Sequence, residues 1–232
     1  MANLQGTERE QYVKKTFRHV ARHYNTMNHL MTFGMDILLR KEVMRIAGLQ
    51  KCELILDAGT GTGDLAREAR SVCPGANITA MDFSLEMMTA GTDWKNIKHC
   101  QADALALPFA GHSFDVVVSG YLVRNVASLD TALAEQYRVL KPGGRIVVLD
   151  TTRPRKNPLT PFIKLYFRTV IPLLGKLLTG NREAYTYLTQ SSENFVYAET
   201  LVEALQSCGF TEIKFRVRMF GTMAIHSANK LQ

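Results

Sequence analysis

Between residues 53 and 150 the chain alternates short apolar runs with segments of helical character. We predict strands at 53–57, 77–82, 97–101, 114–119 and 145–150, and helices at 64–72, 84–91 and 128–140. The run at 114–119 is apolar through its centre, which is typical of a central strand covered on both faces. Because strands that alternate with helices form parallel βαβ units, the sequence predicts an α/β fold with a doubly wound, Rossmann-like sheet.

The segments on either side of this alternation complete one domain. Helical spacing predicts N-terminal helices at 8–31 and 35–47, within a region spanning 1–48. A basic, apolar, proline-punctuated insertion at 151–195 interrupts the rhythm and predicts a helical lid. The C-terminal part, 196–232, contains a predicted helix at 198–207 and strands at 212–218 and 222–228, close enough to pair antiparallel. We therefore expect a single domain over 1–232 with seven strands, its cofactor-binding half at 49–150.

The first predicted strand runs into a glycine-rich turn, Leu56-Asp-Ala-Gly-Thr-Gly-Thr-Gly-Asp64. Ligands of doubly wound sheets bind at this turn, where glycine lets the backbone approach them closely. Dinucleotide enzymes favour GxGxxG, whereas the spacing here is GxGxG with Asp64 directly after it. A carboxylate at that position would repel phosphate and suits a ligand that carries an ammonium group, such as S-adenosylmethionine. A nicotinamide-dependent reductase is disfavoured for the same reasons.

Acidic residues follow three successive predicted strands at one sheet edge. Asp57 ends the first strand, Asp82 ends the second, and Asp103 follows the third. An acid in the position of Asp82 can accept hydrogen bonds from ribose hydroxyls, and Asp103 can reach the amino group of adenine. We therefore expect an S-adenosylmethionine site rather than a binding module that keeps only the fold. The residues expected to form it are Asp57, Gly59, Gly61, Thr62, Gly63, Asp82, Phe83, Asp103, Ala104 and Gly120.

Several sequence blocks resemble the ubiquinone/menaquinone biosynthesis C-methyltransferases over nearly the whole chain. These blocks lie at 24–28, 56–65, 106–109, 113–115, 124–126, 137–144 and 185–188. The resemblance places Thr62, Asp82, Asp103 and Ala104 on cofactor-contacting positions of that family. The chain departs from the family pattern at Gly120, where a serine is usual, at Asn25, where an aspartate is usual, and at Leu39, often a tryptophan.

This resemblance implies methyl transfer to a ring carbon of a prenylated hydroquinone, either demethylmenaquinol or 2-methoxy-6-polyprenyl-1,4-benzoquinol. The carbon becomes nucleophilic when the neighbouring hydroxyl loses its proton, so the enzyme must stabilise a phenolate. Arg124 and Asn125, after the strand at 114–119, are the candidates for that role, and His29 and His226 are alternative bases. Tyr24, Asn28, Tyr185 and Tyr187 are expected to contact the substrate. A methyltransferase that acts on a phospholipid amine or another small molecule is the alternative.

The net charge of +7 equals the charge of one segment, because residues 151–182 hold seven basic residues and no acidic one. The stretch at 162–178 interleaves these cations with aliphatic side chains, which favours a lid or contact with an anionic membrane surface over nucleic-acid binding. A second subunit could also cover it, giving a homodimer. Neither a secretory signal nor an apolar window of about 18 residues is evident, so we expect a cytoplasmic protein, peripheral at the inner face of the membrane. The four cysteines have no CxxC spacing, and no metal site is expected.

Overall fold

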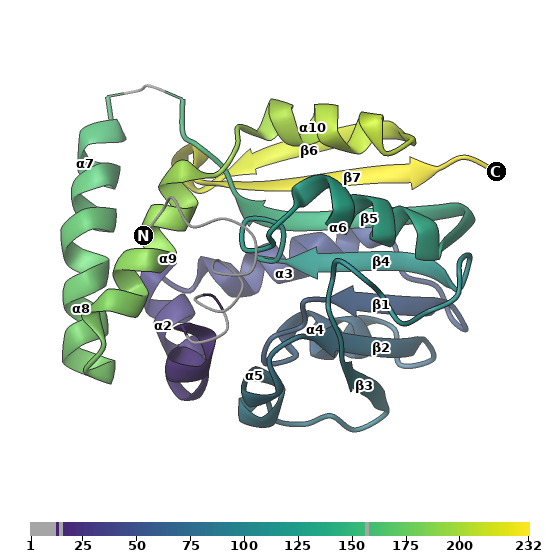
Figure 1. Cartoon of the computed structure of the whole chain (residues 1–232), viewed down its shortest axis with the longest axis horizontal. Helices are drawn as coiled ribbons and strands as arrows, with labels where there is room; N and C mark the ends of the chain where they lie inside the picture. Colours follow the sequence, from purple (N-terminus) through teal and green to yellow (C-terminus); the bar gives the residue numbers. More distant parts are fainter. Residues whose placement is uncertain (1–12, 14–15, 156–157) are drawn as a thin grey trace.

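The computed structural model describes residues 13, 16–155 and 158–232, and these form a seven-stranded sheet between layers of helices (Figure 1). The strand order is β3-β2-β1-β4-β5-β7-β6. The strands β1 to β5 are parallel to one another, whereas β7 is antiparallel to both β5 and β6. The strand bounds are β1 Leu54–Ala58, β2 Asn77–Asp82, β3 Ile97–Gln101, β4 Phe114–Gly120, β5 Leu140–Thr151, β6 Phe210–Arg218 and β7 Met223–Lys230. The predicted doubly wound sheet with a final antiparallel pair is confirmed.

Helices cover both faces of the sheet. The helices α3 (Met35–Ala47) and α4 (Asp64–Val72) pack on one face, while α6 (Leu129–Val139) and α10 (Ala198–Ser207) pack on the other (Figure 1). Strand β4 lies at the centre, and its residues Val116, Val117 and Val118 are fully buried. Val116 and Val118 join the first apolar layer and Val117 joins the second, so an unbroken apolar run is what this strand requires.

The observed bounds differ from the predicted ones at the N-terminal helices and at β5. Residue 13 and residues 16–20 are helical, a 3₁₀ turn (η1) follows at Ala21–His23, and α2 continues from Tyr24 to Met31. The predicted helix 8–31 is thus divided, and residues 8–12, 14 and 15 lie outside the described part. Strand β5 begins at Leu140, five residues earlier than expected, because Leu140 pairs with Phe114 and Arg145 pairs with Val116, so that the turn at 141–144 bulges out between these two pairs.

The insertion is helical, as predicted, and lies beyond the carboxyl ends of the parallel strands. The segments α7 (Thr160–Leu165), η2 (Tyr166–Val170, a π-helical stretch) and α8 (Ile171–Thr179) lie in line, and α9 (Arg182–Asn194) packs along α8 (Figure 1). Gly175 allows this close approach, because a Cβ there would come within 2.2 Å of the Tyr185 ring. Among the described residues, none of the helices is both long and apolar enough to span a bilayer.

Candidate active site

The glycine-rich turn between β1 and α4 adopts the backbone conformation that its sequence predicts. Gly59, Gly61 and Gly63 all have positive φ, at 71°, 56° and 85°, which side-chain-bearing residues rarely adopt. A Cβ at Gly59 would lie 2.7 Å from Leu122 Cδ1, and one at Gly63 would lie 2.6 Å from Trp94. The turn therefore needs glycine for its dihedral angles and also for its close neighbours.

Asp57 organises this turn from beneath. Its Oδ2 accepts hydrogen bonds from Thr60 Oγ1 at 2.6 Å and from the backbone N–H of Ala66 at 3.0 Å, tying the turn to the first turn of α4. The side chain is buried, and this burial raises the pKa of Asp57 to about 7, against the opposing effect of its hydrogen bonds. Asp57 therefore shapes the glycine-rich turn, and it also lines a small cavity next to that turn.

The acids after β2 and β3 also bind backbone groups. Asp82 accepts hydrogen bonds from the N–H groups of Gly61 and Ser84, each at 2.8 Å, and burial raises the pKa of Asp82 to about 6. Asp103 accepts a hydrogen bond from the N–H of Leu105 at 2.8 Å. Each carboxylate oxygen has more than one lone-pair site, so both acids keep the capacity to accept bonds from a ligand.

Three adjoining cavities run along the carboxyl ends of these strands, with volumes of about 250, 40 and 30 Å³. The first and second share Phe83, Leu122 and Asn125, and the second and third share five residues that include Gly59 and Gly61. The expected cofactor residues Asp57, Gly59, Gly61, Thr62, Asp82, Phe83, Asp103, Ala104 and Gly120 line this row. Gly63 does not line it, since it lies against Trp94 and shapes the turn instead.

Sequence reasoning missed several residues of the same row, namely Met87, Gln101, Tyr121 and Leu122. Leu122 follows β4 by two residues and touches the position of Gly59, which no local pattern in the sequence indicates. Gly120 has no side chain, so only its backbone forms the cavity wall at the position where the family usually has a serine. A Cβ at this position would lie 2.8 Å from Leu65 Cδ1.

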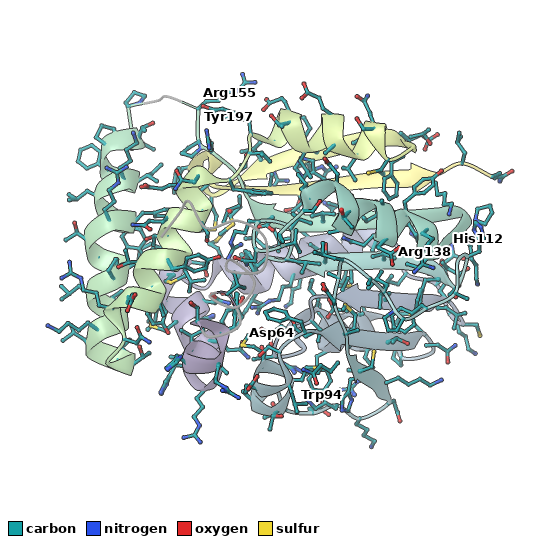
Figure 2. All side chains as sticks on the ribbon, viewed as in Figure 1. Asp64, Trp94, His112, Arg138, Arg155 and Tyr197 are labelled. Atoms are coloured by element: carbon teal, nitrogen blue, oxygen red, sulfur yellow. The ribbon has the colours of Figure 1, made fainter. Side chains whose placement is uncertain are left out.

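Asp64 differs from the sequence-based expectation, in which its charge was available to a ligand. It forms ion pairs with Arg40 at 2.8 Å and with Arg67, and Asn25 Nδ2 donates to it at 3.3 Å. Figure 2 places Asp64 at the end of the sheet that faces α2. The carboxylate is therefore already neutralised by two arginines, and its repulsion of phosphate is weaker than the bare sequence suggested.

Helix α2 closes over the glycine-rich turn. Thr62 Oγ1 donates a hydrogen bond to Asn25 Oδ1 at 2.7 Å, while the amide nitrogen of Asn25 donates to Asp64. An amide can make both bonds, whereas the aspartate usual in the family could only accept. Tyr24, the preceding residue, lines both of the smaller cofactor cavities.

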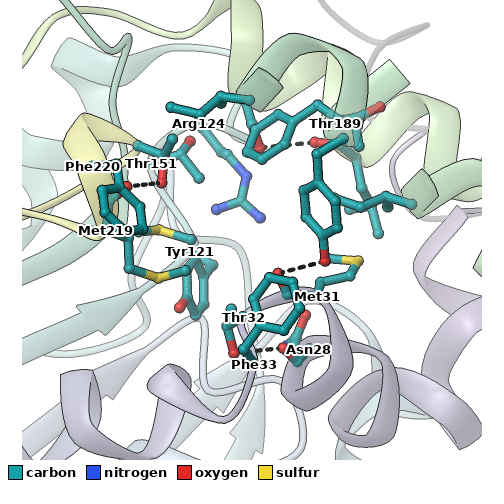
Figure 3. A pocket seen from close by; sticks show the side chains of 18 of the residues that line it. Asn28, Met31, Thr32, Phe33, Tyr121, Arg124, Thr151, Thr189, Met219 and Phe220 are labelled. Carbon is teal, nitrogen blue, oxygen red and sulfur yellow. Dashed lines mark hydrogen bonds between the residues drawn. The ribbon is translucent and has the colours of Figure 1, made fainter. Parts of the chain in front are cut away.

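A fourth, larger cavity of about 380 Å³ lies on the other side of Tyr24 and Tyr121, which line it as well as the two smaller cofactor cavities. It is mostly apolar and is enclosed by α2, the insertion helices and the turn before β7 (Figure 3). Tyr166 Oη donates to the backbone carbonyl of Met31 at 3.2 Å, which joins the insertion to α2. The remaining lining residues include Asn28, Phe33, Thr151, Leu159, Phe162, Ile163, Phe167, Leu188, Thr189, Ser192, Met219, Phe220 and Met223.

Arg124 and Asn125 face different cavities, although they are consecutive. Figure 3 shows the Arg124 guanidinium pointing into the apolar cavity, where it pairs with Asp150 at 2.7 Å and lies 5.0 Å from the centre of the Tyr121 ring. Asn125 instead lines the two cofactor cavities nearest β2 and β3, and its amide donates to the Tyr121 carbonyl at 2.8 Å. The structure therefore brings Arg124 to the apolar cavity and leaves Asn125 outside it.

The Arg124–Asp150 ion pair is buried, with 8% and 1% of the two side chains exposed. Burial alone would lower the pKa of Arg124, but the charge of Asp150 and its hydrogen bond outweigh this, so the pKa is raised. Asp150 also accepts from the N–H groups of Arg124 and Thr151, at 3.1 and 2.7 Å. Arg124 is therefore a permanent cation and not a proton acceptor.

Four other candidate residues lie outside the apolar cavity. Tyr185 and Tyr187 are buried in the apolar cluster between α9 and the N-terminal helices, and this packing replaces their expected substrate contacts. His29 binds Asp36 at 3.0 Å on the outside of α2. His226 is buried in β7, where its Nε2 bonds the Ala198 carbonyl at 2.9 Å and desolvation lowers its pKa. These contacts make both histidines structural, which corrects their interpretation as alternative bases.

The sequence matches the model of the ubiE/COQ5 methyltransferase family over residues 5–230. A ubiquinone/menaquinone biosynthesis C-methyltransferase of Desulfotalea psychrophila is 42% identical over 222 residues, which cover 92% of this chain and 88% of the relative. A demethylmenaquinone methyltransferase of Thermus thermophilus is 37% identical over 219 residues, covering 92% and 99%.

Solved structures share the fold at much lower identity. A phosphoethanolamine N-methyltransferase 2 of Haemonchus contortus, solved with S-adenosylhomocysteine, gives a TM-score of 0.67 at 17% identity, over 93% of this chain and 60% of that one. A possible histamine N-methyltransferase of Thermotoga maritima gives 0.64 at 18% identity, over 93% and 99%. The family match and the relatives from D. psychrophila and T. thermophilus show that this chain belongs to the ubiE/COQ5 methyltransferase family and is an S-adenosylmethionine-dependent methyltransferase.

Proposed function

We propose that the enzyme transfers a methyl group from S-adenosylmethionine to a ring carbon of a prenylated hydroquinone. One observation carries the proposal: an apolar cavity of about 380 Å³ adjoins the cofactor row across Tyr24 and Tyr121 and contains the buried cation Arg124. An apolar cavity suits a ring with a hydrocarbon tail, and a buried cation suits an acceptor that becomes negatively charged. The names of the relatives from D. psychrophila and T. thermophilus point to the same substrate class.

The cofactor row fits an adenosine joined to an amino acid. The largest of the three cavities, beside Phe83 and Asp103, would take the adenine, and Asp82 would accept bonds from the ribose hydroxyls. The smallest cavity, beside Asp57 and Thr62, would take the amino-acid end. When bound, S-adenosylmethionine supplies an electrophilic methyl group on a sulfonium centre.

Arg124 would act on the ring oxygen next to the acceptor carbon. A fixed cation in a low-dielectric cavity lowers the pKa of a nearby phenol, so the proton leaves to water and the phenolate charge spreads to the ortho carbon. Asp150 holds the guanidinium in place, and the aromatic walls at Tyr24 and Tyr121 orient the ring toward the cofactor side. Asn125 would position the turn through Tyr121 rather than contact the ring.

The lining of the cavity disfavours an amine acceptor. Among the described residues that line it, none is acidic, and the charged group is Arg124. A substrate that carries an ammonium group would enter an apolar site next to a like charge, without a carboxylate to offset its desolvation. A neutral quinol meets neither obstacle.

The direct test is methylation of reduced demethylmenaquinone and of the reduced methoxy-benzoquinone, each in detergent, with mass spectrometry to detect one added methyl group. We expect product from one of the two and a loss of about 100- to 1,000-fold in kcat for Arg124→Met, as for removal of an oxyanion-stabilising group. Arg124→Lys should recover part of the rate. Cofactor binding without product from either quinol, or full activity of Arg124→Met, would contradict the proposal.

We also propose that the enzyme reaches its lipophilic substrate by docking the insertion on an anionic membrane surface. The side chains of Phe162, Leu173 and Leu177 on α7 and α8 are 68%, 51% and 71% exposed, and Lys164 and Lys176 are exposed between them. Phe33 and Phe220, which are 77% and 73% exposed, line the apolar cavity together with Phe162. Apolar side chains interleaved with lysines match the acyl boundary and the negative charge of such a bilayer.

Vesicle co-sedimentation tests this docking, with phosphatidylcholine vesicles compared with vesicles that also contain phosphatidylglycerol. We expect the wild type to bind the anionic vesicles. The double variant Phe162→Ser/Leu177→Ser should bind them about 10-fold more weakly or worse, because it loses two apolar side chains that would be buried in the bilayer. Leu85→Ser is the matched control, because Leu85 is 54% exposed on α5 (Leu85–Ala90), outside the insertion. Equal binding to both vesicle types, or a concentration-dependent dimer that the double variant abolishes, would contradict membrane docking.

A further inference from the structure

Arg40 stands out among the residues that line the three cofactor cavities. Among the described residues that line these three cavities, Arg40 is the only basic residue. Its side chain is 13% exposed. It belongs to α3 rather than to the glycine-rich turn, and it reaches the smallest cavity beside Asp57, Thr62 and Asp64. The glycine spacing does not indicate this arginine, because it lies on a separate helix.

The guanidinium of Arg40 is held in place from two sides. Its two terminal nitrogens pair with Asp36 at 3.0 Å and with Asp64 at 2.8 Å. Asp36 is itself fixed by bonds from Thr32 and His29, each at 3.0 Å. A guanidinium has five N–H donors, and the two ion pairs use only two of them. The group is thus preorganised at the wall of the cavity and retains donors for a further acceptor.

We propose that Arg40 binds the α-carboxylate of the methionine portion of S-adenosylmethionine. That end of the cofactor is a zwitterion, and a cavity without a cation would leave the carboxylate unpaired among Asp57 and Asp64. The ion pair between Arg40 and Asp64 offers a matching pair of charges, with Arg40 for the carboxylate and Asp64 for the ammonium group. Arg67, also paired with Asp64, keeps this acid compensated when Arg40 binds the ligand.

Isothermal titration with two cofactors that differ only in this carboxylate tests the assignment. For Arg40→Met we expect an about 10- to 100-fold weaker affinity for S-adenosylmethionine, the range for a lost charge-assisted interaction. The affinity for decarboxylated S-adenosylmethionine should change less than about threefold, because that ligand has no partner to lose. Arg40→Lys should recover part of the loss, since it restores the charge without the planar fork.

Two controls separate recognition of the carboxylate from damage to the site. Arg45→Met removes an arginine from the same helix, 65% exposed and paired with Glu42, and should leave both affinities unchanged. Binding of 5′-methylthioadenosine, which lacks the amino-acid end, should be equal in the wild type and Arg40→Met. A parallel loss for the decarboxylated cofactor or for 5′-methylthioadenosine, or no loss for S-adenosylmethionine, would overturn the assignment. The inference rests on cofactor binding alone, so such a result leaves the quinol proposal open to its own assay.

Discussion

The buried pair of Arg124 and Asp150 predicts a large and specific effect of Asp150→Asn on stability. The side chains are 8% and 1% exposed, so the variant leaves a guanidinium charge in the interior without its partner. Removing one member of a buried pair costs about 3–5 kcal/mol. In a domain of this size 1 kcal/mol corresponds to about 2–4 °C in Tm, so we expect Tm to fall by about 6–20 °C.

The assay is a double-mutant cycle followed by calorimetry and urea unfolding at one pH. The double variant Arg124→Met/Asp150→Asn removes both charges and leaves none uncompensated. Its loss of unfolding free energy should therefore be smaller than the sum of the two single-variant losses, by about 2 kcal/mol or more. Arg155→Met is the control, since its pair with Glu199 is 80% and 45% exposed and such pairs contribute about 0–1 kcal/mol. A Tm change below about 2 °C for Asp150→Asn, or additive single effects, would refute the reasoning that the pair is buried and coupled.

Three further predictions concern the cofactor side. The pKa of Asp57 is about 7 in the folded protein and about 3.8 in the unfolded chain, so the unfolded chain releases this proton at lower pH. As pH rises between these two values, the wild type should lose stability relative to Asp57→Asn, by about 4 kcal/mol at most. Urea-unfolding free energies that change with pH in parallel for the two proteins would contradict this prediction. Gly59→Ala should cost about 1–2 kcal/mol for its positive φ alone and weaken cofactor binding through the 2.7 Å contact with Leu122; wild-type affinity in titration would contradict it. Tyr121→Phe removes a buried hydroxyl that has no hydrogen-bond partner among the described residues, so Tm should stay equal or rise; a fall of more than about 3 °C would contradict it.

The strands and the cofactor row could be predicted because they depend on local signals. Alternating apolar runs define the strands, and the carboxyl ends of parallel strands meet at one edge, so Asp57, Asp82 and Asp103 had to lie near one another. The positive φ angles of Gly59 and Gly61 follow from the same logic, since a tight turn before a helix needs them.

The partners of the site residues could not be predicted, because they depend on packing between distant segments. Asp150 visibly ends a predicted strand, but nothing in the sequence relates it to Arg124, 26 residues earlier. Asp64 resembles a free ligand-binding acid until α3 brings Arg40 to it. Tyr185 lies in a family-like block, yet the helical phase of α9 turns it toward Gly175 and not toward the cavity.

Tyr121 lies between the apolar cavity that Arg124 lines and the cofactor row that Asn125 lines. This residue has φ of 60°, a conformation that costs a side-chain-bearing residue about 1–2 kcal/mol, and it follows directly after β4. Its N–H donates to the Leu149 carbonyl at 2.8 Å, its carbonyl accepts from Asn125, and the Arg124 guanidinium lies over its ring. The contacts of Arg124 and Asn125 with Tyr121 therefore hold the strained turn. This turn places the Tyr121 ring between the cofactor row and the apolar cavity. For the ring substrate that we propose, this held turn would fix the Tyr121 ring as a wall against which the acceptor ring could align with the cofactor.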